Sequence, residues 1–325
     1  MTGVQTCALP ISMRFASDFE CCHAFDNLDA MLKCDDVDIL VVATPSGAHM
    51  EAAVAAARAG KHVLCEKPLD VSLGRIDQMI AAHKASGTRL GCTFQLRYMP
   101  ALSPIRAAMR EGRFGTLTYA GVYVPWWRTD DYYFKSSWHG TQGLDGGGAL
   151  INQSIHMVDL LCDVMPPVES VAGFCSSVGH PGVETEDAAT AILKFKGGSL
   201  GIIYGSTSAW PGKSKRLEIS GTKGTVVLED DKLVVFDFLD RRVQDDEVRR
   251  DFGLCGVKHA PVAGASEPSV VSELHAACFK DFMSCLSNDR PFMIDGHSAR
   301  KSAEIVFAVY ESARQGTVID IDLHK

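Results

Sequence analysis

The sequence has no long apolar run. No hydrophobic stretch in its 325 residues reaches the ~18 residues that a transmembrane helix needs, which excludes such a helix. Positive charge is not in excess either, because 32 Lys and Arg stand against 40 Asp and Glu, a net charge of −8. A general nucleic-acid binder needs a cationic surface, so that class is disfavoured. Hydrophobic residues still make up 46% of the chain, enough for a sizeable core in about two domains.

The cysteines lack the spacing of a metal site or a disulfide framework. There are eleven of them, an odd number, and Cys21 and Cys22 are adjacent rather than separated by two residues as in a zinc site. Scattered cysteines in a chain of this length are mostly small buried hydrophobes. We therefore expect no bound metal and a reducing, cytoplasmic location.

From residue 37 the sequence shows strands and helices in alternation. Runs rich in β-branched residues alternate with segments of helical spacing, and these elements are expected at 37–43, 49–60, 61–65, 71–85 and 88–93. This spacing is typical of a parallel α/β sheet, whose right-handed crossovers bring the carboxyl ends of the strands to one edge. Ligands of open α/β sheets bind at that edge. We therefore expect the loops 44–49, 65–68 and 94–98 to lie beside a ligand.

Strands that follow one another directly dominate the chain after about residue 95. They are expected at 168–177, 187–196, 199–206, 214–220, 224–229 and 232–238. Short connections between successive strands predict an antiparallel sheet. Helices are expected from the glycine run 146–148 to about residue 162, near 271–287 and near 298–314. The predicted fold class is α/β, with a parallel-sheet domain followed by an α+β domain that has a large, mostly antiparallel sheet.

Three segments carry residues suited to chemistry. They are ATPS with the nearby His49 at 43–49, GKHVLCEKP at 60–68 and GGGALINQSIHMVD at 146–159. Together, in this order and spacing, they resemble the Gfo/Idh/MocA oxidoreductase family, named after glucose-fructose oxidoreductase, inositol dehydrogenase and a rhizopine catabolism protein. The resemblance extends from about Arg14 to the C-terminus.

This resemblance implies a fold and an activity. The fold would be an incomplete Rossmann-like NAD(P)-binding domain over residues 13–95 and a substrate-binding and oligomerisation domain over 96–325. The activity would be hydride transfer between NAD or NADP and a carbinol carbon of a sugar, sugar derivative or cyclitol. The implied partners are that small molecule and further copies of the chain in a homo-dimer or tetramer, with neither nucleic acid nor membrane involved. The substrate and the choice between NAD and NADP stay open.

The resemblance also implies roles for single residues. Lys67 matches the position that touches nicotinamide and the substrate hydroxyl, and its peptide bond to Pro68 is typically cis in the family. His156 matches the general acid/base. Asn152, at the third catalytic position, stands where the family often has Asp, so a carboxylate that would orient the imidazole is missing. The other matched positions line the cofactor (Thr44, Pro45, His49, Glu66) or the substrate (Arg97, Tyr98, Trp138).

The chemistry of these residue types is compatible with the roles. The cofactor takes the hydride, and an imidazole with a pKa of ~6.5 suits the remaining proton transfer. A lysine ammonium can hold a developing alkoxide. Asn152 and His156 are four residues apart, so both project from one helix face. Each residue also has an ordinary alternative, since lysines are mostly solvated and His, Asn and aromatic side chains often serve packing. For His49 that alternative is a structural role.

Two features of the family have no counterpart before residue 37. One is a first strand with a Gly-x-Gly-x-x-Gly loop, which holds the pyrophosphate of the cofactor. The other is a second strand that ends in a residue that contacts the ribose. Residues 1–12 have neither a cationic start nor a periodic pattern, and we interpret them as an extraneous leader in place of missing family residues. This interpretation predicts impaired NAD(P) binding and a chain that could be inactive.

Two other functions remain open from the sequence. Some proteins with this fold hydrolyse glycosides by using a bound NAD in a redox cycle. Regulatory members keep the fold and the cofactor pocket without the catalytic residues and act as binding modules. The presence of both Lys67 and His156 disfavours the binding module.

Overall fold

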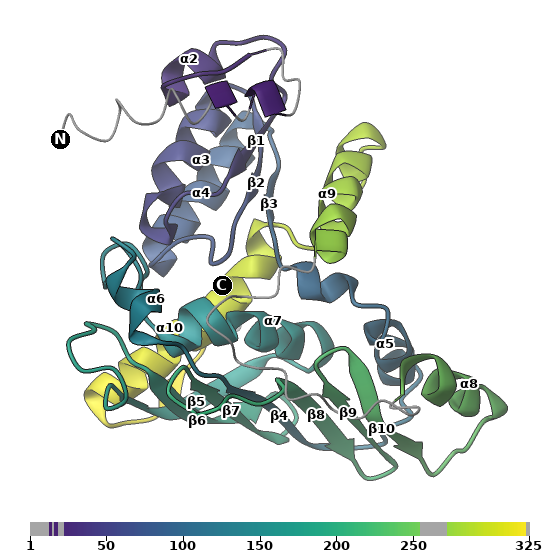
Figure 1. Cartoon of the computed structure of the whole chain (residues 1–325). Helices are drawn as coiled ribbons and strands as arrows, with labels where there is room; N and C mark the ends of the chain where they lie inside the picture. The colour runs from purple at the N-terminus through teal and green to yellow at the C-terminus, as the bar shows by residue number, and fades with distance from the viewer. Residues whose placement is uncertain (1–12, 15, 19–22, 254–271, 323–325) are drawn as a thin grey trace.

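The computed structural model describes residues 13–14, 16–18, 23–253 and 272–322 (Figure 1). The strands of this part of the chain form two sheets. A parallel sheet has the strand order β1-β2-β3, and an eight-stranded sheet has the order β10-β9-β8-β4-β7-β6-β5-β11. The expected fold class, a Rossmann-like parallel sheet followed by a large and mostly antiparallel one, is confirmed. No helix within the described ranges has the length and apolar character needed to cross a membrane.

The first sheet forms from short, buried runs. Its strands run parallel, with Val42 opposite Cys65 and Cys65 opposite Cys92, so their carboxyl ends meet at one edge. Ser72 caps the helix α4 with its side chain, and Gly87 ends that helix at φ 70°, where glycine is favoured. The elements are α2 Leu28–Leu32, β1 Ile39–Val42, η1 Ser46–Ala48, α3 His49–Arg58, β2 His62–Cys65, α4 Leu73–Ser86 and β3 Leu90–Cys92.

The second sheet is antiparallel except where β4 pairs with β7 in parallel. Buried and exposed residues alternate along β6, so one face is covered and the other is open. The helices α7 and α10 lie on the covered face (Figure 1). The strands are β4 Leu117–Pro125, β5 Val168–Ser176, β6 Ala188–Phe195, β7 Leu200–Ser206, β8 Arg216–Gly221, β9 Gly224–Glu229, β10 Lys232–Phe238 and β11 Ile319–Asp320. The helices of this half are η2 Gln95–Tyr98, α5 Leu102–Arg110, α6 Asp130–Phe134, α7 Ile155–Val164, α8 Val243–Phe252, α9 Ser272–Ser287 and α10 Gly296–Gln315.

The open face of the large sheet is partly apolar. Ile192 of β6 is 60% exposed, and Phe174 of β5, opposite Thr190 on the same face, is 79% exposed. Exposed apolar side chains that share one face are typical of association surfaces. The homo-oligomer implied by the family resemblance stays a prediction.

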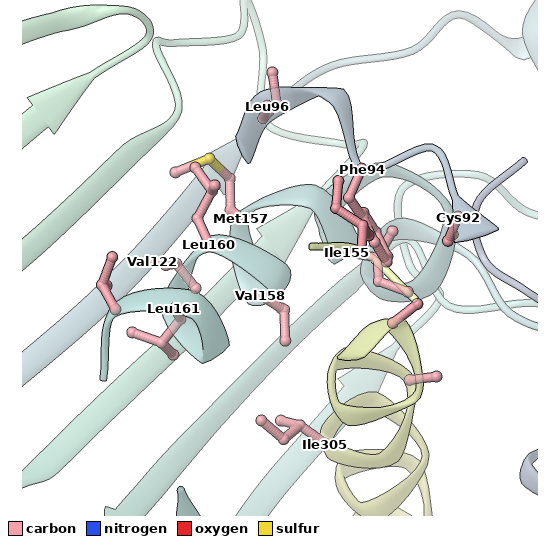
Figure 2. Close-up of a cluster of buried hydrophobic side chains, with 14 of the residues drawn as sticks. Cys92, Phe94, Leu96, Val122, Ile155, Met157, Val158, Leu160, Leu161 and Ile305 are labelled. Carbon is pink, nitrogen blue, oxygen red and sulfur yellow. The ribbon is translucent and has the colours of Figure 1, made fainter. Parts of the chain in front are cut away.

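A continuous hydrophobic core joins the two sheets through α7. In Figure 2, side chains of α7 lie beside Phe94, which follows β3, and near Ile305 of α10. The helix α10 also contacts α4, β3 and β5, and Cys92 donates its backbone N–H to the carbonyl oxygen of Ile294, just before α10, at 2.9 Å. The end of the chain therefore packs against both sheets and fixes α7 relative to the first one. The domain boundary expected after residue 95 stays a prediction.

A buried ion pair fastens the loop after β3 to α7. Arg97 of η2 donates from Nη2 to Asp159 Oδ1 at 2.6 Å and from Nε to Asp159 Oδ2 at 2.7 Å. A third nitrogen of the guanidinium, Nη1, donates to Ser298 Oγ of α10 at 2.8 Å. The Arg97 residue is 4% exposed and Asp159 is fully buried. One side chain thus links η2, α7 and α10 in a bidentate, water-shielded geometry, which is the strongest arrangement of such a pair.

We predict that Arg97→Met lowers the free energy of unfolding by about 3–5 kcal/mol, because it leaves the Asp159 carboxylate buried without its counter-ion. Urea denaturation followed by circular dichroism measures this. The matched control is Arg110→Met on the exposed face of α5, which should change stability by no more than about 0.5 kcal/mol. Equal effects of the two substitutions would contradict the assignment.

Candidate active site

Lys67 lies at the carboxyl edge of the first sheet, two residues after β2 ends. Its peptide bond to Pro68 is cis, as the family resemblance implied. The Lys67 Nζ donates to the backbone oxygen of Asn152 at 2.7 Å and lies 3.4 Å from the Asn152 Oδ1. Burial lowers the pKa of Lys67 from its ordinary value, while the carboxylates of Glu66 and Asp145 act in the opposite direction. Two of the three segments singled out in the sequence therefore meet directly.

Asn152 lies in a π-helical turn, Ala149–Ser154, which leads straight into α7. The Ser154 hydroxyl donates to the carbonyl oxygen of Ala149, five residues earlier, at 2.8 Å. The sequence pattern predicts an ordinary helix here, so the wider turn is a difference. Isolated π-turns occur often at functional sites.

The carboxylate of Glu186 explains this turn. It accepts the backbone N–H groups of Gly148 at 2.7 Å and Leu150 at 2.8 Å, and also the Tyr310 hydroxyl at 2.8 Å. A Cβ atom on Gly148 would lie 1.8 Å from the backbone oxygen of Glu186, so the close approach requires glycine. Glu186 stands 38 residues further along the chain than Gly148, and helical periodicity gives no sign of it.

His156 lies in the first turn of α7, edge-on to the ring of Phe94 at 5.8 Å between centroids. Its Nδ1 atom is buried and has no hydrogen-bond partner in the described part of the chain. Burial lowers the pKa of His156 well below its ordinary value, and the nearby Lys67 ammonium lowers it further. The imidazole is therefore neutral at neutral pH, which is the state that a proton acceptor must start from.

Asp145 belongs to this site, although the sequence reasoning did not select it. The residue is 1% exposed, and its Oδ1 accepts a hydrogen bond from the Asn152 Nδ2 at 2.6 Å. Burial raises the pKa of Asp145 to about 6, and Lys67 and the Asn152 hydrogen bond oppose that increase. The available signal was an acidic residue directly before the glycine run, which is too common in loops to identify a site.

The residues predicted to line the cofactor lie at the ends of β1 and β2. Thr44 is exposed, and Pro45 and Glu66 are half-buried. His49 is buried between their loops, with Nε2 2.9 Å from the carbonyl oxygen of Thr44 and Nδ1 3.0 Å from that of Pro68. Its ring thus holds the loop after β1 against the loop after β2. We propose that His49 shapes this edge of the sheet, and the cofactor contacts stay predictions.

Trp138 belongs to an aromatic group beside the site. Its ring is 4.1 Å from that of His139, which stacks on Tyr132 at 4.3 Å between centroids. Burial lowers the pKa of His139, and the charges of Lys67 and Arg128 contribute to this. The aromatic group therefore lies within electrostatic range of the Lys67 ammonium. A substrate contact of Trp138 stays a prediction.

Arg97 and Tyr98 direct their polar groups at other parts of the protein. Arg97 is held by Asp159, and the Tyr98 hydroxyl donates to Asp281 Oδ2 of α9 at 2.7 Å. We propose that these two residues fix η2 in place. The substrate contacts expected for them stay predictions.

The described residues include seven cysteines and one group of three potential metal ligands. Seven described cysteines are free thiols, and the cytoplasmic location expected from them stays a prediction. His23, Cys34 and Asp36 bring one ligand atom each within 4.8 Å of one another. They are exposed or half-buried and precede β1, and exposed groups of this kind are common without a bound ion.

Two family models match the chain. The first, described as an oxidoreductase family with an NAD-binding Rossmann fold, matches residues 5–94, and the second, the GFO/IDH/MocA C-terminal domain, matches residues 103–227. The first match begins inside the segment 1–12 that was interpreted as an extraneous leader. That segment lies outside the described residues, and the interpretation stays a prediction.

Curated relatives and solved structures agree with these matches. The 1,5-anhydro-D-fructose reductase of Ensifer adhaerens is 31% identical over 199 residues, and the myo-inositol 2-dehydrogenase of Thermotoga maritima is 29% identical over 214 residues. These matches cover 59% and 62% of this chain but only 57% and 60% of those proteins. The WlbA dehydrogenase of Bordetella pertussis, solved with NADH and UDP-GlcNAcA, superposes with a TM-score of 0.86 at 31% identity, over 97% of this chain and 88% of that one.

We predict that Gly148→Ala destabilises the protein by at least the ~1–3 kcal/mol typical of an overpacked core, because the new methyl group would meet the backbone of Glu186. Urea denaturation measures the change. Gly143→Ala is the matched control from the same loop, since a Cβ there has nothing within 4 Å. An unchanged midpoint for Gly148→Ala would show that the turn is not held in the described way.

Proposed function

Because the chain belongs to the Gfo/Idh/MocA oxidoreductase family, we propose that it transfers a hydride between a nicotinamide cofactor and a carbinol carbon of a sugar-like substrate. The observation that carries this proposal is the 2.7 Å hydrogen bond from Lys67 Nζ to the backbone oxygen of Asn152. It joins the carboxyl edge of the first sheet to the turn that leads into His156. An ammonium group and a neutral imidazole are thereby held at one site.

The relatives support the substrate class. One is named a 1,5-anhydro-D-fructose reductase and another a myo-inositol 2-dehydrogenase, and WlbA was solved with a nucleotide sugar and NADH. All three ligands or substrates in these names carry ring hydroxyl or carbonyl carbons that a hydride can leave or reach. We propose a sugar, sugar derivative or cyclitol for this chain.

The residues present fit the nicotinamide end of such a cofactor. Thr44 and Glu66 border the carboxyl edge of a parallel sheet, the place where α/β folds bind nucleotides, and Lys67 lies beside them. The pyrophosphate end has no matching feature, because the sequence before β1 contains no Gly-x-Gly-x-x-Gly loop and only one glycine, Gly3, in residues 1–36. We therefore assign these residues to the nicotinamide end alone.

The chain's own residues would handle the proton and the charge. When bound, the nicotinamide supplies the hydride chemistry. In the oxidation direction, neutral His156 accepts the proton of the substrate hydroxyl, and it returns that proton in the reduction direction. The Lys67 ammonium stabilises the negative charge that develops on the substrate oxygen. Asn152 holds the ammonium in position through its backbone oxygen.

We predict that Lys67→Met and His156→Asn each lower kcat/KM by about 100-fold or more, because each removes a group that acts in the transition state. The assay follows NADH absorbance at saturating cofactor with a panel that includes UDP-GlcNAcA, myo-inositol and 1,5-anhydro-D-fructose. Circular dichroism verifies that the variants are folded.

Lys84→Met is the matched control, because Lys84 is an exposed lysine of α4, and it should retain the wild-type rate. Wild-type rates for Lys67→Met or His156→Asn would refute the proposed roles. Release of an aglycone without net change in NADH would point to a glycosidase instead, and sugar binding without turnover would point to a binding module.

We also predict that this chain binds NADH and NADPH more weakly than the micromolar range. The physical reason is that residues 1–36 contain no Gly-x-Gly-x-x-Gly pattern, since helix N–H groups after such a loop hold the pyrophosphate in dinucleotide-binding folds. Isothermal titration calorimetry with each cofactor measures the affinity. A micromolar dissociation constant for either would contradict the prediction and would mean that other residues hold the phosphates.

A further inference from the structure

A buried carboxylate stands one amide away from Lys67. Asp145 accepts two hydrogen bonds, from the Gly140 backbone N–H to Oδ2 at 2.8 Å and from the Asn152 Nδ2 to Oδ1 at 2.6 Å. Asn152 in turn presents its Oδ1 at 3.4 Å from the Lys67 Nζ. The carboxylate, the amide and the ammonium therefore form a continuous line from the loop before the glycine run to the site.

The acceptor character of Asp145 fixes which way the Asn152 amide points. An amide has one donor end and one acceptor end, whereas an ionised carboxylate only accepts. With the donor end bound to Asp145, the acceptor end must face Lys67. The reverse orientation would bring amide hydrogens against the ammonium and an amide oxygen against the carboxylate, and both contacts repel.

We propose that Asp145 is a positioning residue that orients the Asn152 amide toward Lys67 and supplies the negative charge that Asn152 itself lacks. This inference rests on the proposed hydride transfer. It explains how the site works with an amide at position 152, because the carboxylate that the resemblance leads one to expect there is present one side chain further away.

The charge of Asp145 depends on its surroundings. The groups around it are the Lys67 ammonium, the Glu186 carboxylate and the hydroxyls of Tyr132 and Tyr133. Burial raises the pKa of Asp145 to about 6. The residue is therefore charged at neutral pH, and its charge is lost as the pH falls through about 6. Below that value the protonated carboxyl can donate, so the amide orientation is no longer fixed.

The decisive variant is Asp145→Asn. Gly140 and Asn152 donate to different oxygens of the Asp145 carboxylate, and in an asparagine one of these positions becomes an NH₂ group. One donor therefore stays unpaired, or the Asn152 amide turns its NH₂ toward Lys67. We expect kcat to fall by about 10-fold or more, a loss typical for partners that orient a functional group. In wild type, kcat should decrease as the pH falls through about 6, because Asp145 becomes protonated there. Asp145→Asn should lack this decrease.

The double variant Asp145→Asn, Asn152→Asp tests the direction of the effect. Gly140 can donate to the new amide oxygen, the new amide NH₂ can donate to the carboxylate at position 152, and Lys67 can donate to that carboxylate. All hydrogen bonds are satisfied and the negative charge is restored next to Lys67. We expect most of the lost activity to return. Asp131→Asn, at an exposed position of α6, is the control and should match wild type.

A second readout does not depend on turnover. The Asp145 carboxylate raises the pKa of Lys67, so removing it should lower that pKa, and the double variant should bring it back. NMR titration of the protein carrying ¹³C-labelled lysine measures this in each variant. If Asp145→Asn does not fold, Asn152→Ala breaks the same line, and it should lower both kcat and the pKa of Lys67.

The outcomes separate this inference from the proposed function. A folded Asp145→Asn protein with wild-type kcat and an unchanged Lys67 titration would overturn the inference, as would a double variant as impaired as the single one. If wild type binds the cofactor but turns over no substrate of the panel, the proposed function fails. The Lys67 titration then still decides whether Asp145 acts on the lysine.

Discussion

The hydrogen bond from the Lys67 ammonium to the backbone oxygen of Asn152 is the constraint on which the site depends. Its donor follows a strand of the small sheet, and its acceptor lies in a turn packed on the large one. A bond of this kind keeps its geometry only if the two sheets are fixed relative to one another. The shared core around α7 and the Arg97–Asp159 pair provide that rigidity. Packing far from the chemistry thus determines where the ammonium lies.

The acceptor side is held by polar contacts in addition to packing. Glu186 accepts hydrogen bonds from two backbone amides at the start of the π-turn. The Tyr310 hydroxyl of α10 donates a third hydrogen bond to the same carboxylate. Burying a carboxylate costs free energy unless hydrogen bonds satisfy it, and here three donors do so. The glycine at position 148 is what allows the backbone of Glu186 to come close enough. The conformation of the π-turn therefore depends on both the Glu186 carboxylate and the glycine at position 148.

The sequence was sufficient to predict the elements that depend on residues close together in the chain. The three parallel strands fall within the expected segments, and β2 ends at Cys65 as expected, because short β-branched runs between helices indicate a parallel sheet. The π-turn at 149–154 was not predictable, since it depends on Glu186, which is distant in sequence. Neither was the role of Asp145, because only the fold brings its carboxylate to the Asn152 amide. Long-range polar contacts leave no periodic signal, and the missed features are of that kind.

Burial acts on the three ionisable groups of the site in a consistent way. It lowers the pKa of Lys67 and His156 and raises that of Asp145, so by itself it would remove every charge. The mutual attraction of Lys67 and Asp145 opposes the effect of burial on their pKa values, whereas the Lys67 charge shifts the pKa of His156 in the same direction as burial. The carboxylate favours a charged lysine, and the charged lysine favours a neutral histidine, so an ammonium and a proton acceptor coexist at neutral pH. An aspartate at position 152 would place its charge directly against the ammonium. A carboxylate one amide away acts in the same direction through the oriented Asn152 amide, so either arrangement keeps the lysine charged beside a neutral imidazole.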